Sequence, residues 1–241
     1  MSKEDILSIL ESTVIVSVQA QDNEPLNKPE HLLALCQSVI SGGASALRLC
    51  GVENINYISK KVSAPIIGLT KVEPTPINFL DTVYISASMQ DVESLINTSA
   101  DIIALDGTPR KRIDGSSLKE QIDLVKKSGK IVLCDISTYD EGLVAIDLGA
   151  DMLSTTLSGY TRQTRKLVNE GPDLDLLADL CEECDIPVIM EGRIWEPEEV
   201  KEAFELGAFA VVIGTAITRP QKITKRFISA IPEKLASERK S

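Results

Sequence analysis

Three side chains that can move protons follow three separate apolar runs of the chain. Lys71 comes after IIGL (66–69), Asp135 closes IVLCD (131–135) and Glu191 closes VIME (188–191). A lysine that is desolvated and close to other cations has a lowered pKa and can act as a base, while carboxylates facing it can orient it or carry protons themselves. Such mixed groups suit removal of a proton next to a carbonyl. The alternative is that Lys71 is a plain ligand for a phosphate or a carboxylate.

Two glycine-containing stretches near the C-terminus are typical of phosphate binding. EGRI (191–194) and IGTAITRP (213–220) each follow an apolar run. Small residues let backbone N–H groups approach a phosphate, and a short helix that follows can aim its N-terminus at it. The candidates are Gly192, Arg193, Gly214, Thr215 and Arg219. In the alternative interpretation these glycines only form turns and Arg219 makes a surface salt bridge.

The elements that must hold these residues are short buried strands alternating with amphipathic helices. Apolar runs predict parallel strands at 14–18, 46–49, 66–69, 102–106, 131–135, 152–156, 188–191 and 210–214. Eight such units predict an α/β fold, a (β/α)8 TIM barrel with phosphate-binding loops after its seventh and eighth strands. A doubly wound sheet is disfavoured, because QAQDNEP follows the first strand without a glycine fingerprint.

A ninth apolar run, VYIS (83–86), is predicted as a short extra strand inside the loop after 66–69, with the helix of that unit following it. No linker or repeat divides the chain. We therefore expect one barrel domain over residues 1–241, with its core at about 10–231 and a polar tail at 232–241 that frays.

Polar residues at the C-terminal ends of the strands are the candidates for the active site of such a barrel. Nearly every predicted strand ends in one. Besides the residues already named, they are Gln19, Arg48, Asp106, Thr108, Thr155, Thr156 and Ser158.

The amino-acid composition disfavours several classes of binding partner. With 25 Lys and Arg against 36 Asp and Glu, the net charge of −11 disfavours nucleic acid and anionic membrane surfaces. No apolar run approaches the roughly 20 residues that span a bilayer, and no secretory signal is evident, so we expect a cytoplasmic protein. The five scattered cysteines are predicted to be reduced thiols. A single histidine, His31, excludes metal sites that need two or more, and we predict no metal site.

Taken together, the motifs resemble one family, the N-acetylmannosamine-6-phosphate 2-epimerases. The matching stretches occur in the family's order over roughly residues 10–231. They are VIVSVQA, ALRLCGVENI, APIIGLTK, DIIALDGTPRKRIDG, CDISTYDEGLVAIDLGAD, STTLSGYT, EGPDLDLL, IPVIMEGRI and GAFAVVIGTAITRPQKITKRFISAI. The resemblance implies a cofactor-independent barrel that interconverts N-acetylmannosamine 6-phosphate and N-acetylglucosamine 6-phosphate, a step of bacterial sialic-acid breakdown. It also suggests a homodimer.

The resemblance further implies roles for individual residues. Lys71 would remove the C2 proton of the open-chain sugar, and Glu191 would be the second acid/base group. Gln19, Arg48 and Asp135 would position the substrate, and the phosphate end would lie at Gly192, Gly214, Thr215 and Arg219. Return of the proton to the opposite face needs either two bases, or one base with a substrate hydroxyl as relay.

Two other functions stay open at this point. One keeps the barrel and changes the chemistry to another phosphosugar isomerase or lyase. The other is a non-catalytic phosphosugar sensor, which would have no need for Lys71 and Glu191 together.

Overall fold

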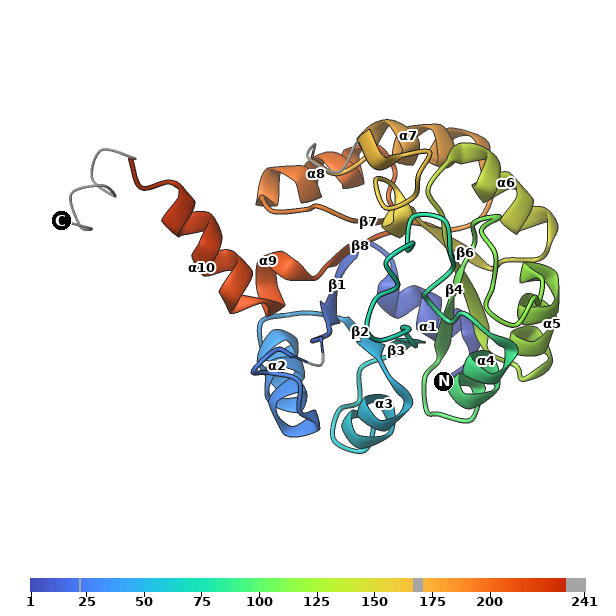
Figure 1. Ribbon diagram of the computed structural model, residues 1–241, viewed down its shortest axis with the longest axis horizontal. Helices are drawn as coiled ribbons and strands as arrows, with labels where there is room; N and C mark the ends of the chain where they lie inside the picture. The colour runs from blue at the N-terminus through green and yellow to red at the C-terminus, as the bar shows by residue number, and fades with distance from the viewer. Residues whose placement is uncertain (22, 167–170, 233–241) are drawn as a thin grey trace.

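Eight parallel strands form the centre of the protein and close on themselves as a barrel (Figure 1). The computed structural model describes residues 1–21, 23–166 and 171–232. The strands pair in chain order and the first pairs with the eighth, so the predicted (β/α)8 TIM barrel is confirmed. The strands are β1 Thr13–Val18, β2 Ala46–Cys50, β3 Ile66–Leu69, β4 Ile102–Asp106, β5 Ile131–Asp135, β6 Met152–Ser154, β7 Val188–Glu191 and β8 Ala210–Ile213.

Helices surround the barrel, and local sequence signals mark where several of them begin. At the start of α5 (Leu118–Lys127) and α6 (Tyr139–Asp147), Ser117 and Thr138 cap a backbone N–H, while the carboxylates of Glu120 and Glu141 accept from the N–H of the cap residue. Proline occupies the first turn of α2 (Pro29–Ser41) and α8 (Pro197–Glu205), where its missing N–H is harmless. The helices of the described ranges are α1 Lys3–Leu10, α2 Pro29–Ser41, α3 Val52–Ile58, α4 Met89–Ile96, α5 Leu118–Lys127, α6 Tyr139–Asp147, η1 Thr155–Leu157, α7 Leu174–Glu183, α8 Pro197–Glu205, α9 Thr215–Thr218 and α10 Pro220–Ser229.

The strand predicted at 152–156 is shorter in the structure. β6 ends at Ser154, and the single 3₁₀ turn η1 follows. The chain bends here because the N–H of Leu157 donates to the carbonyl of Ile136 (3.1 Å), beyond the end of β5. This turn directs Thr156 toward the barrel mouth.

The extra strand predicted at 83–86 is absent as a strand. The segment makes only isolated bridges, an antiparallel one between Lys71 and Ile85 and a parallel one between Thr82 and Lys111. The helix predicted after it is present as α4. Of the polar tail predicted at 232–241, only Pro232 lies within the described residues.

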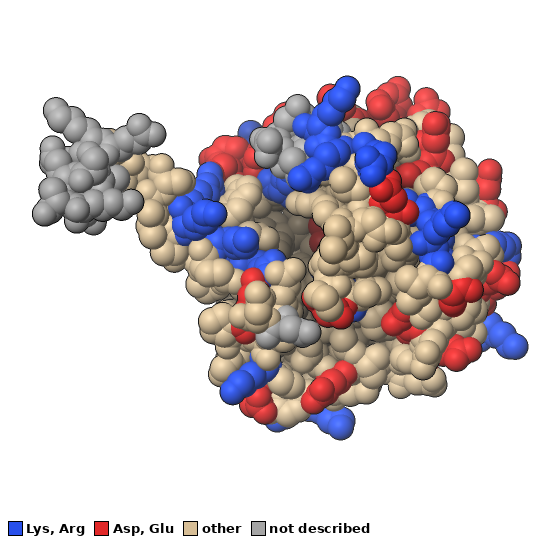
Figure 2. Space-filling view, in the orientation of Figure 1, with Lys and Arg blue, Asp and Glu red and all other residues tan. Residues whose placement is uncertain are grey.

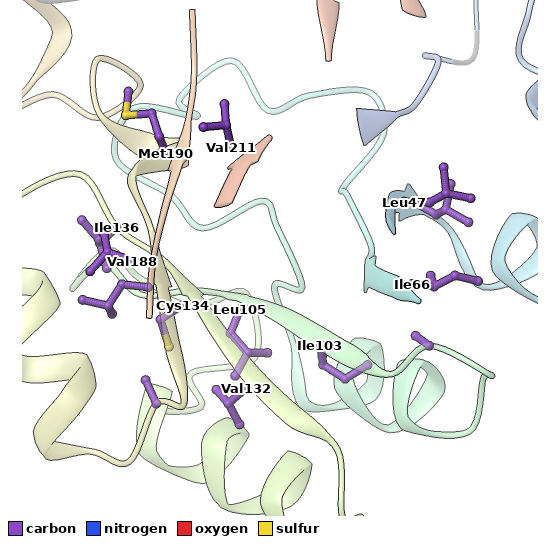
Figure 3. Close-up of a cluster of buried hydrophobic side chains, with 14 of the residues drawn as sticks. Leu47, Ile66, Ile103, Leu105, Val132, Cys134, Ile136, Val188, Met190 and Val211 are labelled. Carbon is purple, nitrogen blue, oxygen red and sulfur yellow. The ribbon is translucent and has the colours of Figure 1, made fainter. Parts of the chain in front are cut away.

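Two layers of apolar side chains hold the barrel together. The outer layer fills the space between strands and helices, and Figure 3 shows part of it, including Leu47, Ile103 and Val211. The inner layer fills the barrel itself. Because α1 contributes Ile6 and Leu10 to this inner layer, the helix closes the N-terminal end and leaves the opposite end for a site. No helix in the described parts of the chain is both long enough and apolar enough to span a bilayer.

The outer layer is tight enough at Gly68 for one methyl group to disturb it. A Cβ there would lie 2.8 Å from Ala100 Cβ and 3.0 Å from Ile55 Cδ1. We expect Gly68→Ala to lower the free energy of unfolding by about 1–3 kcal/mol, measured by urea denaturation. Gly42→Ala is the matched control. Gly42 has a helical φ of −79° and is exposed, and the nearest atom to a Cβ there would be the carbonyl oxygen of Val39 in its own helix, at 3.3 Å, so stability should change by less than about 0.5 kcal/mol. Equal effects in the two variants would contradict the packing argument.

Candidate active site

A cavity of about 570 Å³ opens at the C-terminal ends of the strands. Figure 2 shows it as a hollow, with Lys and Arg side chains gathered beside it over α9 and α10 and near α7 and α8. Most of the predicted site residues line it, namely Gln19, Lys71, Thr156, Glu191, Gly192, Arg193, Gly214, Thr215 and Arg219. Arg48 and Asp135 are not among the lining residues, since their side chains are 1% and 0% exposed beneath the cavity floor.

A buried guanidinium lies between two carboxylates under this floor. Arg48 donates from Nη1 to Asp135 Oδ1 (3.0 Å) and from Nη2 to Oδ2 (2.6 Å). Nη1 also lies 3.1 Å from Glu191 Oε2. Burial by itself would lower the pKa of Arg48, but the charges of Asp135 and Glu191 raise it, so the guanidinium stays charged. Arg48 lies on β2, Asp135 on β5 and Glu191 on β7, so closure of the barrel brings the three side chains together.

Thr156 links the two carboxylates from the side. Its hydroxyl lies 2.8 Å from Asp135 Oδ1 and 3.0 Å from Glu191 Oε2. One hydroxyl carries one proton, so it can donate to only one of these oxygens at a time. The 3₁₀ turn η1, which follows β6, carries this hydroxyl.

The pKa of Glu191 is raised above its ordinary value of 4.5. Burial is the largest cause, and the nearby negative charge of Asp135 adds to it, while Arg48, Thr156 and Lys71 act in the opposite direction. A carboxyl with a raised pKa exchanges protons closer to neutral pH, as a general acid or base requires. Glu191 is 13% exposed, so it remains accessible from the cavity.

Lys71 lies across the cavity from Glu191. Lys71 follows β3 and Glu191 is the last residue of β7, and these two strands are four positions apart in the ring of eight. The Lys71 charge contributes to the pKa of both Glu191 and Cys50, which places the amine within electrostatic reach of each. Cys50 is the last residue of β2, and burial raises the pKa of its thiol, so it is neutral at physiological pH.

The predicted phosphate end has small residues and two anchored arginines. Gly192 has φ +119°, a conformation that favours glycine. A Cβ at Gly214 would lie 3.3 Å from Ser17 Cβ, so the backbone there approaches β1 closely. Arg193 donates from Nε to the carbonyl of Gly171 (2.8 Å) and also bonds the carbonyl of Ser158.

Arg219 is paired with a carboxylate at the rim of the cavity. Its Nη2 bonds Glu24 Oε1, which also accepts from Gln221 (2.7 Å). Burial acts to raise the pKa of Glu24, but bonds from Gln21 and Arg219 outweigh it and lower the pKa. Arg219 Nε is buried without a hydrogen-bond partner in the described parts of the chain. A buried donor without an acceptor is rare, so this atom suits a bound anion.

Several lining residues were not among the predicted site residues. Among them are Cys50, Phe79, Tyr84, Tyr160 and Trp195. Phe79 and Tyr84 come from the loop after β3, where they meet edge to face with ring centroids 6.2 Å apart. Burial raises the pKa of Tyr84 to about 12, so its hydroxyl is neutral. The segment NFLDTVYI (78–85) contains both aromatic residues and could have marked them as candidates. The strand pattern alone does not show that this loop turns back over the barrel mouth.

Comparisons with known proteins agree with this geometry. A family model described as "Putative N-acetylmannosamine-6-phosphate epimerase" matches residues 32–233. The chain belongs to this epimerase family. Two relatives named "Putative N-acetylmannosamine-6-phosphate 2-epimerase" are similar over nearly their whole length. The one from Caldanaerobacter subterraneus is 45% identical, covering 95% of each chain. The one from Clostridioides difficile is 42% identical, covering 94% of this chain and 99% of the relative.

A solved structure is also similar to this member of the epimerase family. The N-acetylmannosamine-6-phosphate 2-epimerase from Clostridium perfringens superposes with a TM-score of 0.87 at 40% sequence identity, covering 94% of this chain and 96% of that one. The resemblance noted in the sequence is therefore confirmed at the level of the family and the fold.

The raised pKa of Glu191 makes stability depend on pH in a defined direction. The folded protein binds a proton at this carboxyl more tightly than the unfolded chain, whose pKa is near 4.5. This contribution is complete below pH 4.5 and is lost as the pH rises through the folded-state pKa. We expect the free energy of unfolding of the wild type, minus that of Glu191→Gln, to fall as the pH rises from 4.5. Urea denaturation over a pH series measures it, and a difference that stays constant or grows would contradict the assignment.

Proposed function

We propose that the protein interconverts N-acetylmannosamine 6-phosphate and N-acetylglucosamine 6-phosphate by removing and returning the proton at C2 of the open-chain sugar. One observation carries the proposal: Lys71 and Glu191 line the same cavity from opposite sides, and the glycine-lined loops after β7 and β8 open into it. The family membership supports the same substrate. The reaction changes a configuration and no oxidation state, so it needs no redox partner.

In this scheme the amine of Lys71 takes the C2 proton, and the resulting enolate receives a proton on its opposite face from a second acid or through a hydroxyl of the substrate. A proton next to an aldehyde becomes removable only when the charge that develops on the carbonyl oxygen is stabilised. Glu191, with its raised pKa, can donate a hydrogen bond to that oxygen in its protonated form. Arg48 and Asp135 are buried below it, so in our proposal they act on the substrate chiefly by holding Glu191 in place.

The substrate phosphate lies at the other end of the cavity in this scheme. Backbone N–H groups near Gly192, Gly214 and Thr215 can approach it because the side chains there are small or absent. The unpaired Nε of Arg219 adds a charge-assisted donor. Gln19, whose Oε1 is buried without a partner among the described residues, is placed to bind a hydroxyl or amide of the sugar.

Proton NMR in D₂O tests the proposed reaction. The wild type, given N-acetylmannosamine 6-phosphate, should produce N-acetylglucosamine 6-phosphate with deuterium at C2. Lys71→Ala should lower the exchange rate by about 10²–10⁴-fold, the range of a lost general base. Lys60→Ala removes an exposed lysine and should leave the rate unchanged. Folded wild-type protein that neither converts the sugar nor exchanges its C2 proton would rule out the epimerase, leaving another phosphosugar reaction or a sensor.

We also propose that the protein is a homodimer in the cytoplasm. α10 projects away from the barrel (Figure 1), and none of its residues is buried. Phe227 is 73% exposed and Ile228 58% exposed on this helix, an apolar surface that a second copy of the chain would cover. The five cysteines are free thiols, which fits a reducing compartment, and a charged phosphosugar does not cross a membrane unaided.

Light scattering after size exclusion tests the dimer. The wild type should have twice the chain mass of 26.2 kDa, and Phe227→Asp should shift it to the monomer mass by placing a charge in the interface. Ser229→Asp adds the same charge on the opposite side of α10 and should leave the mass unchanged. A monomeric wild type would refute the proposal.

A further inference from the structure

Lys71 lacks the strand neighbour that its place in the barrel would suggest. β3 and β4 pair only at Ile67 with Ile102 and at Gly68 with Ile103. Beyond these pairs the two strands separate, and residues 83–86, the inserted segment, run beside Lys71 instead. The N–H of Val72 donates to the carbonyl of Tyr84 (2.9 Å), on one side of the antiparallel bridge between Lys71 and Ile85. The backbone that carries Lys71 is therefore held by the inserted segment.

Ser86 fastens this segment to the barrel with every polar group it has. Its N–H donates to the carbonyl of Thr70 (3.0 Å), the residue before Lys71. Its hydroxyl donates to the carbonyl of Ala104 in β4 (2.8 Å), and its carbonyl accepts from Gln121 Nε2 (3.0 Å). Ser86 is fully buried and has φ +45°, which is unfavourable for a residue other than glycine. Such a conformation persists only where the surroundings over-determine it.

Gln121 holds Ser86 from the helix side of the barrel wall. It lies on α5 and is 0% exposed among the apolar residues of that helix. A buried amide is costly unless it is hydrogen-bonded, and here both ends are used. Nε2 donates to Ser86, and Oε1 accepts from Arg112 Nε (2.9 Å), whose Nη2 bonds the carbonyl of Asp106. Neither Ser86 nor Gln121 lines the cavity.

We propose that Ser86 and Gln121 are positioning residues for Lys71, which hold its amine across the cavity from Glu191 through the inserted segment. The proposal rests on the proposed function for its kinetic consequences, but the placement of Lys71 can be measured without turnover. A misplacement of a catalytic group by about 1 Å costs on the order of 10²-fold in rate. Loss of the hydroxyl bond of Ser86 or of the amide bond from Gln121 should therefore lower kcat and leave the phosphate end of the cavity intact.

The variants are chosen to remove single bonds. Ser86→Ala removes the hydroxyl bond to Ala104 and keeps the same backbone demand at residue 86. Gln121→Glu keeps an acceptor for Arg112 and removes the donor to Ser86. Thr98→Ala is the control, because Thr98 is also buried and bonds the carbonyl of Leu95 (2.6 Å), at the opposite end of the barrel. Circular dichroism and urea denaturation identify the variants that fold. If only one of Ser86→Ala and Gln121→Glu folds, that variant alone carries the test.

The experiment has two readouts. In steady-state kinetics we expect Ser86→Ala and Gln121→Glu to lower kcat about 10- to 100-fold, with KM and the Kd for inorganic phosphate within about twofold of wild type. In trace labelling with acetic anhydride, read by mass spectrometry, the ratio of labelling at Lys71 to that at the exposed Lys60 should rise about threefold or more, because the half-buried Lys71 becomes more accessible when its backbone is released. Thr98→Ala should match wild type in both.

The second readout keeps the proposal separate from the function. If the wild type does not epimerise, the proposed reaction fails, and the labelling ratio still decides whether these residues hold Lys71. An unchanged ratio in folded Ser86→Ala and Gln121→Glu would overturn the proposal. So would a wild-type kcat in both, or a loss of phosphate affinity that parallels the loss of kcat, which would indicate general damage to the cavity.

Discussion

The barrel mouth depends on one buried cluster of charge, the Arg48 guanidinium between Asp135 and Glu191. Removing a charge from water is expensive, and a buried ion persists only when its partners and hydrogen bonds are well placed. Asp135 meets this need with two bonds to Arg48. Glu191 then brings a second negative charge to a single positive one. Burial, together with this excess of negative charge, raises the pKa of Glu191.

The rest of the fold can be understood as the means of placing these few groups. A closed ring of parallel strands points alternate side chains inward, so residues far apart in the chain meet at one end. The lower end is filled by α1 and the inner apolar layer, which leaves the upper end for polar residues. The loop after β3 then folds back over the mouth, where it adds Phe79 and Tyr84 to the cavity wall. The site is thus polar at its floor and rim and aromatic along one side.

Much of this was predictable from local patterns. Short apolar runs ending in polar residues indicated the eight strands, and most of the site residues predicted at or just after the strand ends line the cavity, because period and position within a strand are local properties. Their chemical roles were not testable in this way and remain predictions. The inserted segment at 83–86 was recognised as apolar and predicted as a strand. It forms only isolated bridges, because its neighbours depend on where β3 and β4 separate, which is not a local property of the sequence. A salt bridge of Arg219 was one of the two interpretations, but its partner Glu24 could not be identified from the sequence, nor could the burial of Arg48 below the floor, since both arise from contacts between distant parts of the chain.

The positions of the buried charges also bear on how such a barrel can be divided. The first four strands carry Arg48, and the last four carry Asp135 and Glu191. A half-barrel that closed over its inner surface would bury Arg48, or Asp135 and Glu191, without the counter-charge, which favours folding of the ring as one unit. The same constraint limits recombination between related genes: a crossover in the middle of the chain yields a sound barrel only if both parents share this arrangement of charge.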